Sequence, residues 1–410
     1  MRFGDSVELF SLAGIPMVGN MDSGAVAGLT PEGAALCERL AREDVAEEEA
    51  RAVDENLVNF LVAGRFFEDA AERAAAPASA YLHVTQRCNL DCKGCYSLDD
   101  DRNSLADAPF EAMARAIDEL AGAGVRTLIV SGGEPFLRAD LPQLVQRAKE
   151  AGITAVTVIT NGTCTTDEVL AALAPWADTV AVSVDGWSAD CPAHIRSEQR
   201  YDQLADTVRR IQAAGMKAHI VPTIHALNYD DLPRYVEMGD ALGATMNYSL
   251  LSCEACDALA HLLPGDNELR ELARGLLALG ASPRQSTSGP FGVNLDVKRS
   301  CGAGCKELSV AADGTVYPCH MLHRAEWALG NVFEEPLADL LQGERARTLA
   351  TLDAAAIEDC RDCRHRQLCG GGCRARSLYA FGDLAHKDGY CAMMEEYYDR
   401  LGAGLASQFA

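Results

Sequence analysis

Short apolar runs recur along the chain between residues 80 and about 250. They read YLHVT, RTLIVS, AVTVIT, TVAVSV, AHIVPTI and TMNYSLL, and amphipathic stretches such as PFEAMARAIDELAGAG and YDQLADTVRRIQAAG separate them. Strands that alternate with helices predict βα units and a parallel sheet. Six such units favour an α/β fold of the partial (β/α)6 TIM-barrel type over a doubly wound sheet, although spacing alone leaves both open.

Residues 1–75 have the pattern of a small separate α+β unit. The stretches VELFSLAG and PMVGNMDSGAVAGL predict short strands, and a helix begins at Thr30-Pro31, a capping residue followed by proline in the first turn. A second helical stretch, ENLVNFLVAGRFF, closes the unit. The segment AERAAAPAS (71–79) predicts a linker to the barrel domain at 80–250.

Beyond residue 250 the regular alternation stops. A bridging region, 251–300, contains a predicted helix at about 266–279 and the Ser/Gly/Pro-rich loop ASPRQSTSGPFG. The stretch LSVAADGTVYPC predicts a hairpin with Asp313-Gly314 in a type I′ turn. Residues 301–395 are short-looped and rich in cysteine, which predicts a region that needs metal to fold. A last helix (392–403) and a tail (396–410) end the chain.

Composition narrows the classes of function. The chain has 16 Cys, and its start, MRFGDSVELFSLAG, lacks the apolar core of a signal peptide. No apolar run approaches the roughly 18 residues of a membrane span. We therefore expect a cytoplasmic, membrane-free protein whose thiols bind metal. The net charge of −24 disfavours nucleic acid and chiefly indicates solubility, with a basic peptide partner as a second possibility.

The array CNLDCKGC directly follows the first barrel strand. Its thiolates, Cys88, Cys92 and Cys95, can hold three irons of a cubane and leave the fourth iron open. Structural zinc sites and electron-transfer clusters usually take four protein ligands. Since catalytic residues of β/α barrels lie at the carboxyl ends of strands, the position favours a catalytic cluster, with a zinc site as the alternative.

Three later strand ends carry polar or glycine-rich motifs. These are SGGEP (131–135), TNGT (160–163) and SVDG (183–186). Paired glycines let the backbone approach a ligand closely, and Glu134 can accept a hydrogen bond from an ammonium group. Ser183 and Asp185 alternate along their strand, so both can face the hydroxyls of a ribose. Plain turns remain the alternative for each motif.

The C-terminal cysteines form a second pattern. It reads Cys301-x12-Gly314-x4-Cys319, then C-x2-C-x5-C-x3-C from Cys360 to Cys373, then Cys391. Four thiolates also suit zinc, but the pair that ends at Cys373 is spaced C-x3-C rather than the C-x2-C of a zinc ribbon.

Together these motifs resemble the radical S-adenosylmethionine (SAM) enzymes with a C-terminal SPASM domain, over residues 80–395. The resemblance implies that the open iron chelates the amino and carboxylate groups of SAM, and that reduction then yields a 5′-deoxyadenosyl radical. One departure is Gly94, where the family often has an aromatic residue against the adenine; Tyr96 can partly substitute. The residues implied to contact SAM are Tyr96, Gly132, Gly133, Glu134, Asn161, Ser183, Asp185 and Arg196.

The resemblance also implies two auxiliary [4Fe–4S] clusters, and hence three clusters in all. The implied ligands of the first are Cys301, Cys305, Cys319 and Cys373, with Cys305 the variably placed member, and those of the second are Cys360, Cys363, Cys369 and Cys391. Hydrogen bonds to cluster cysteines, rather than ligation, are expected of His320, His323 and His365. The remaining thiols, Cys253, Cys256, Cys37, Cys164 and Cys191, are interpreted as ordinary residues, although the first two can also supply a ligand or line a channel.

SPASM enzymes mostly modify peptides, and residues 1–75 resemble the winged RiPP recognition element, which binds leader peptides by strand addition. The stretch CGAG…DGTVYPCH…LGNV is similar to maturases of Cys-rich ribosomal peptides (RiPPs), which form thioethers. Sulfatase maturases have an Asp base where this chain has His320. The resemblance implies a precursor-peptide substrate and a flavodoxin- or ferredoxin-type reductant, with the surplus electron leaving through the auxiliary clusters. The alternative is carbon–carbon crosslinking or another oxidative modification, of either a peptide or a quinone- or haem-type small molecule. Two distant alternatives are not radical SAM enzymes: an electron carrier and a zinc-dependent peptide-binding module.

Overall fold

The computed structural model describes residues 1–409 except 69–76, 98–101, 197, 281–294 and 351. Most of the expected linker (71–79) and the loop ASPRQSTSGPFG lie outside the described residues. Within the described part of the chain, we find no helix with the length and apolar character needed to span a bilayer.

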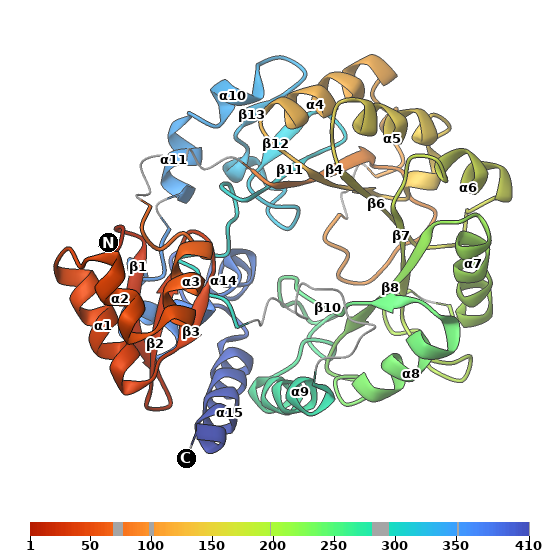
Figure 1. The fold of residues 1–410 in the computed structure, drawn as a ribbon. Coiled ribbons are helices and arrows are strands. Elements are labelled where there is room, and N and C mark those ends of the chain that lie inside the picture. Colours follow the sequence, from red (N-terminus) through yellow and green to blue (C-terminus); the bar gives the residue numbers. More distant parts are fainter. Residues whose placement is uncertain (69–76, 98–101, 197, 281–294, 351, 410) are drawn as a thin grey trace.

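The N-terminal residues form a sheet of their own, covered by helices (Figure 1). Strands β1 (Val7–Leu12), β2 (Ile15–Asn20) and β3 (Val26–Gly28) make an antiparallel meander. Helices α1 (Pro31–Arg42), α2 (Glu47–Val53) and α3 (Glu55–Ala63) pack beside it, and α2 was not anticipated. Thr30 caps α1 by accepting from Gly33 N–H, which confirms the predicted start of that helix.

The central sheet is parallel, and its strands follow one another in chain order. Its main strands are β4 (Ser79–Thr85), β5 (Thr127–Gly132), β6 (Ala155–Thr160), β7 (Thr179–Val184) and β8 (Lys217–Ile224). Short strands β9 (Thr245–Met246) and β10 (Ser249–Leu250) add to β8. The strand order does not reverse, which excludes the doubly wound alternative and confirms the partial barrel.

Helices cover the outer face of this sheet (Figure 1). They are α4 (Phe110–Gly122), α5 (Leu141–Glu150), α6 (Asp167–Leu173), α7 (Tyr201–Ala213) and α8 (Leu232–Leu242). Buried apolar side chains such as Leu82, Val130 and Val158 join strands and helices into one core. The carboxyl ends of the strands therefore meet at one rim, where the cysteine array follows β4.

The C-terminal hairpin continues the barrel sheet. Strand β11 (Glu307–Val310) pairs parallel with β4, with Ser309 opposite Tyr81, and then leads through β12 (Thr315–Tyr317) to β13 (Gly330–Asn331). The predicted hairpin is present, but its turn is not type I′. Only Gly314 has a positive φ, of 86°, and its N–H bonds to the Ala311 carbonyl, as in a four-residue turn followed by a glycine bulge.

The remaining helices are short, except for α9 and the last. They are α9 (Asp266–Leu279), α10 (Leu337–Leu340), α11 (Glu344–Ala350), α12 (Glu358–Arg361), α13 (Arg366–Cys369), α14 (Arg374–Phe381) and α15 (Cys391–Phe409). Helix α9 matches its prediction. The predictions of a helix end at 403 and a tail at 396–410 are wrong, because α15 continues to Phe409. Its apolar side chains Leu401 and Leu405 pack with Leu12 and Met17 of the N-terminal sheet.

Candidate active site

The cysteine loop lies against the end of β5. Gly133 donates its backbone N–H to the Thr85 carbonyl at 2.8 Å, and a Cβ at Gly133 would overlap the Arg87 carbonyl oxygen. A Cβ at Gly132 would overlap the Thr85 carbonyl oxygen in the same way. Both glycines are therefore required by backbone packing next to Cys88, a structural role beside the ligand contact expected from the sequence.

The three thiols of the loop influence one another's ionisation. Burial raises the pKa of Cys92 to about 11, and the nearby thiols of Cys95 and Cys88 add to the rise. Burial also raises the pKa of Cys88. None of the sixteen cysteines is paired in a disulfide. The donor set fits a cubane with one open iron, since the loop that follows a barrel strand offers three thiols near enough to act on one another electrostatically.

A segment at residues 102–107, which we call the return segment, contacts the start of the cysteine loop through hydrogen bonds and an ion pair. The Asn103 side-chain oxygen accepts from the Cys88 N–H at 2.8 Å. Asp107 forms an ion pair with Arg87, the residue before Cys88. Burial would raise the pKa of Asp107, but the bonds from Arg87 and from a threonine hydroxyl outweigh it and hold the pKa below its ordinary value. This segment carries no motif and could not be found from the sequence alone.

Glu134 connects two strand ends. Its buried carboxylate accepts hydrogen bonds from the Phe136 N–H at 3.0 Å, the Thr160 hydroxyl at 2.8 Å and the Asn161 N–H at 2.7 Å. Asn161 in turn donates to the Asn89 side chain at 2.9 Å, within the cysteine loop. Both oxygens of Glu134 are thus engaged by the protein, and its contact with an ammonium group stays a prediction.

Asp185 and Arg196 are brought together at the end of β7. They form an ion pair, and the Arg196 backbone N–H also donates to the Asp185 carboxylate at 2.8 Å. The sequence predicted a ribose contact for Asp185 and a SAM contact for Arg196, but no pair between the two residues. Ser183 lies two residues earlier on the same strand and is partly exposed. The adjoining pocket is lined by Asn161, Asp185, Gly186, Arg196, Glu198, Gln199, Arg200, Tyr201 and Leu204.

The position before Cys95 has a backbone conformation that favours glycine over an aromatic residue. Gly94 has a φ of +66°, and a Cβ there would lie 2.9 Å from the side chain of Leu251. The side chain of Tyr96 contacts Ser131 and His320. Its hydroxyl lies 2.8 Å from the Ser131 hydroxyl, and its ring lies edge-on to the His320 ring, with 5.1 Å between the ring centres. Tyr96 therefore lies between the cysteine loop and the C-terminal hairpin, and its adenine contact stays a prediction.

The C-terminal thiols fall into two groups. Burial raises the pKa of Cys319 strongly, and Glu307, Cys373 and Cys301 add to it. Cys301 likewise adds to the raised pKa of Cys305, after burial. Of the four thiols expected at the first auxiliary cluster, those of Cys301, Cys319 and Cys373 thus interact, and Cys305 is linked to them through Cys301.

The thiols of the second group also affect one another's pKa. Burial raises the pKa of Cys369 to about 12, with contributions from Cys360 and Cys363. Burial raises the pKa of Cys391 to about 12, and Cys369 and Cys363 contribute again. The chemistry of the donors, four clustered thiols in each group, fits an iron–sulfur cluster in each.

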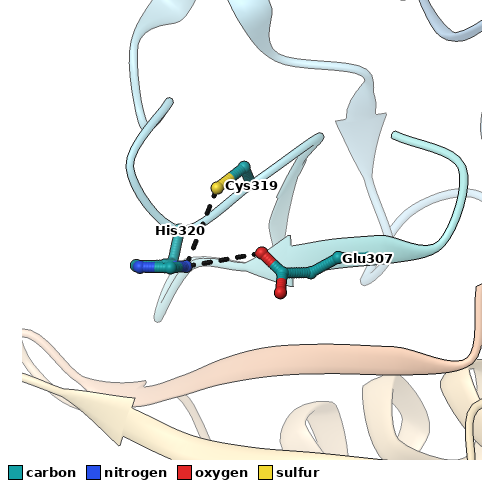
Figure 2. A group of neighbouring side chains, drawn as sticks. All are labelled: Glu307, Cys319 and His320. Carbon is teal, nitrogen blue, oxygen red and sulfur yellow. Dashed lines mark hydrogen bonds and ion pairs between the residues drawn. The ribbon is translucent and has the colours of Figure 1, made fainter. Parts of the chain in front are cut away.

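Two polar side chains, those of His320 and Glu307, lie beside Cys319 on the barrel side of the hairpin (Figure 2). The Nδ1 atom of His320 is 3.5 Å from a carboxylate oxygen of Glu307 and 3.7 Å from the Cys319 sulfur. Burial would raise the pKa of Glu307, but the hydrogen bond and the charge interaction with His320, together with a hydrogen bond from Cys319, outweigh it and keep the pKa below its ordinary value. The expected hydrogen bond between His320 and a cluster cysteine is therefore present, with Glu307 as a partner that the sequence did not indicate.

Further aromatic and histidine rings line the same side. Tyr81 stacks on His320 at 3.9 Å, and His83 lies 4.5 Å from His323 between ring centres. Burial, then the two other histidines, lowers the pKa of His83 well below its ordinary value, so it is neutral. His83 was not predicted from the sequence, although the alternation in YLHVT places it on one face with Tyr81.

The other two histidines differ from expectation. His323 bonds to the Ser309 hydroxyl at 2.8 Å, and His365 bonds to Asp399 at 2.7 Å, rather than to a cysteine. Burial raises the pKa of Cys37 to about 12 within the N-terminal core, as for an ordinary core residue. Cys253 lies next to Gly94, and Cys256 is exposed.

The fold and site together define a class: a β/α-barrel enzyme with a three-cysteine cluster loop and a second, cysteine-rich metal domain. Family models agree. Residues 82–239 match the radical SAM superfamily, and residues 301–364 match the iron–sulfur cluster-binding domain named SPASM. The chain belongs to the radical SAM enzymes with a SPASM domain, and its cofactors are iron–sulfur clusters and SAM.

Its relatives differ in substrate. A PqqA peptide cyclase of Ruegeria pomeroyi is 29% identical over 343 residues, 79% of this chain and 89% of that protein. An AdoMet-dependent heme synthase of Methanosarcina barkeri is 25% identical over 77% of this chain and 96% of its own length. The mycofactocin maturase MftC of Mycolicibacterium smegmatis is 28% identical over 77% of this chain and 83% of its own length.

Solved structures show the same fold. Streptococcus suis SuiB bound to S-adenosylmethionine has a TM-score of 0.63 at 17% identity and covers 95% of this chain and 100% of its own. The anSMEcpe protein with bound AdoMet has a TM-score of 0.64 at 17% identity and covers 81% of this chain and 96% of its own.

Proposed function

We propose that this chain is a cytoplasmic peptide maturase that joins a cysteine sulfur to a carbon atom of a ribosomally made precursor peptide, as a thioether. The observation that carries the proposal is the position of His320. Its ring meets Tyr96, next to Cys95, and its Nδ1 atom approaches Cys319 of the first auxiliary set. A substrate placed there would face both metal-binding regions at once.

The residues present fit the cofactors of such a reaction. Cys88, Cys92 and Cys95 would hold the SAM cluster, while the two C-terminal thiol groups would hold the auxiliary clusters. When bound, the clusters and SAM supply a 5′-deoxyadenosyl radical and an acceptor for the electron that the substrate gives up. The pocket beside Asp185 and Arg196 would take the polar ends of SAM, after their ion pair opens.

The chain's own residues would position the peptide and limit water. The rings of Tyr81, His83 and Tyr96 form an apolar-faced wall, and His83 is neutral. Thioether formation removes two hydrogens from the peptide: one from the acceptor carbon as an atom, and one from the thiol as a proton with an electron left over. The space beside these rings therefore has to accommodate a thiol and a C–H group of the peptide. The reaction requires no charged group of the substrate there.

Residues 1–75 would bind the leader of the precursor. Strand β3 pairs with β2 on one side, and the described part of the chain places no strand on its other side, so an added peptide strand would find free backbone groups there. A flavodoxin- or ferredoxin-type protein would reduce the clusters. The names of two relatives, a PqqA peptide cyclase and a mycofactocin maturase, support a peptide substrate.

The test is coexpression of this chain with each short peptide encoded beside its gene, followed by mass spectrometry. Loss of two hydrogens with one cysteine no longer alkylatable supports thioether formation. The same loss with every cysteine alkylatable means another crosslink. No change in any neighbour favours a small-molecule substrate, as the heme synthase relative suggests. Cys88→Ala should abolish any change, whereas Cys256→Ala, at an exposed thiol, should not.

A further inference from the structure

The return segment places a positive charge on the cysteine loop. The Arg102 guanidinium donates from Nη2 to the Cys95 sulfur at 3.4 Å and from Nη1 to the Leu90 carbonyl at 3.3 Å. It also interacts electrostatically with all three thiols of the loop, most strongly with Cys95. A guanidinium stays protonated at any physiological pH, so this charge is permanent.

Its neighbours hold Arg102 in this place. The next residue, Asn103, accepts from the Cys88 N–H at 2.8 Å. Four residues further, Asp107 accepts from the Thr85 hydroxyl at 2.5 Å. The return segment is thus fixed to both ends of the strand-to-loop junction, and the guanidinium is not a freely moving surface group.

A second arginine near the loop is already neutralised. Arg196 also acts on Cys92, but it forms an ion pair with the buried Asp185. For Arg102, no carboxylate among the described residues lies within ion-pair distance. Of these two cations, Arg102 is therefore the one whose charge acts on the sulfurs without a paired anion in the described structure.

The consequence is redox chemistry. A cubane held by three thiolates gains one negative charge on reduction, and a nearby cation stabilises the more negative form. Hydrogen bonds to cluster sulfurs and local charge are known determinants of cluster potentials. We propose that Arg102 raises the reduction potential of the cluster at Cys88, Cys92 and Cys95, and so sets how readily that cluster accepts the electron. The proposal rests on these cysteines holding the SAM cluster, and it does not depend on which substrate the enzyme modifies.

The experiment is a redox titration of the reconstituted full-length protein, monitored by electron paramagnetic resonance. The first cluster is recognised as the signal that changes on addition of SAM and that is missing from the variant with all three loop cysteines replaced by alanine. For Arg102→Gln, we expect the ratio of reduced to oxidised first cluster at a fixed potential to fall about tenfold, a shift of 59 mV for a one-electron couple. The auxiliary signals should not shift.

Arg102→Lys provides a second measurement, should Arg102→Gln bind less iron. Lysine keeps the charge but cannot reach the sulfur and the Leu90 carbonyl at once, so its midpoint should lie between those of the wild type and Arg102→Gln. Arg209→Gln, at an exposed arginine on α7, is the matched control and should leave the midpoint unchanged. Arg102→Gln with wild-type iron content and a wild-type midpoint would overturn the proposal, and so would an Arg102→Lys midpoint no higher than that of Arg102→Gln. A peptide left unmodified with the shift present would instead count against the proposed function alone.

Discussion

At the scale of single residues, the cysteine loop depends on backbone contacts that leave no space for side chains. Gly133 is the clearest case, because a Cβ there would overlap the carbonyl of Arg87, one residue before Cys88. Backbone cannot move aside as a flexible side chain can. The loop geometry that brings the three thiols together is therefore tied to a residue that binds no iron.

Gly133→Ala should displace the loop and lose the first cluster. We expect the purified, reconstituted variant to contain markedly less iron and to lack the SAM-sensitive paramagnetic signal, while the auxiliary signals persist. Gly122→Ala is the control: nothing lies within 4 Å of a Cβ at that position, at the end of α4. Full iron content in Gly133→Ala would show that the loop tolerates the displacement.

His225 gives a prediction about pH. It is 1% exposed at the end of β8, and burial, followed by His194 and His261, lowers its pKa to about 4. The unfolded chain, with a histidine pKa near 6.5, binds the proton first as the pH falls. Stability is thus complete above pH 6.5 and declines as the pH falls towards 4. When the pH falls from 7.5 to 5.5, the titration of His225 should lower the free energy of unfolding by about 1 kcal/mol.

The measurement is the thermal midpoint at a fixed scan rate at both pH values, for the wild type and His225→Gln. The wild type should lose more of its midpoint on acidification than the variant does. Equal losses would mean that His225 becomes protonated in the folded protein without cost.

Single residues were predictable where spacing carried information. The positions of Cys88, Cys92 and Cys95 follow from a motif, and in the structure the thiols of Cys88 and Cys95 act electrostatically on that of Cys92, while their ligation of iron stays a prediction. Arg102 and Glu307 carry no such signal, since an arginine in a polar stretch and a glutamate at the start of a strand are ordinary. Only the fold shows that they approach sulfurs, at Cys95 and Cys319.

At the scale of elements, the cysteine-rich region is held by a buried ion pair. Arg376 on α14 donates to Asp388 through Nε at 2.7 Å and Nη2 at 2.6 Å, and Asp388 also accepts from the Cys373 and Tyr390 N–H groups. The pair links α14 to the start of α15 and orients Cys373. Such a pair is costly to break from one side only, because a buried charge is left without its partner.

Arg376→Met should therefore lower the free energy of unfolding by about 3–5 kcal/mol. Iron bound by the C-terminal thiols should fall with it, which iron analysis and cluster absorption would measure. Arg361→Met, at an exposed arginine on α12, provides the comparison and should change neither. Unchanged stability in Arg376→Met would show that water or another group can replace the guanidinium.

Strands and helices of the barrel were predicted well, because burial on one or both faces fixes their periodicity. The pairing of β11 with β4 was not, since hydrophobic pattern gives a strand's faces but not its neighbour along the edge. The end of α15 was also misjudged. Its last turns carry Gly402 and Gly404, which weaken helix propensity, but packing of Leu401 and Leu405 on the N-terminal sheet outweighs that weakness.

At the scale of the whole molecule, the C-terminal region has little apolar core of its own. One buried cluster within it consists of Leu322, Leu349, Ala375, Leu378 and Leu384, and another of only Ala354, Ile357 and Cys360. The barrel core is far larger. Much of the order of the cysteine-rich region should therefore come from its metal.

Removal of iron by a chelator should loosen this region selectively. Hydrogen exchange followed by mass spectrometry should show faster exchange in residues 301–390 and little change in strands β4 to β8. Reconstitution with iron and sulfide should restore the protection. Exchange that is unchanged throughout would show that packing alone orders the region.

The strand pairing between β4 and β11 has a consequence for how the chain is made. The outer edge of β4 is satisfied by residues 307–310, which leave the ribosome only after the entire barrel has been synthesised. Until then the first strand of the barrel presents unpaired backbone groups, the kind of edge that recruits other strands. A nascent chain would have to be shielded through that interval. A fragment ending at residue 250 would keep the edge open permanently, so the barrel excised on its own should self-associate rather than serve as an independent module.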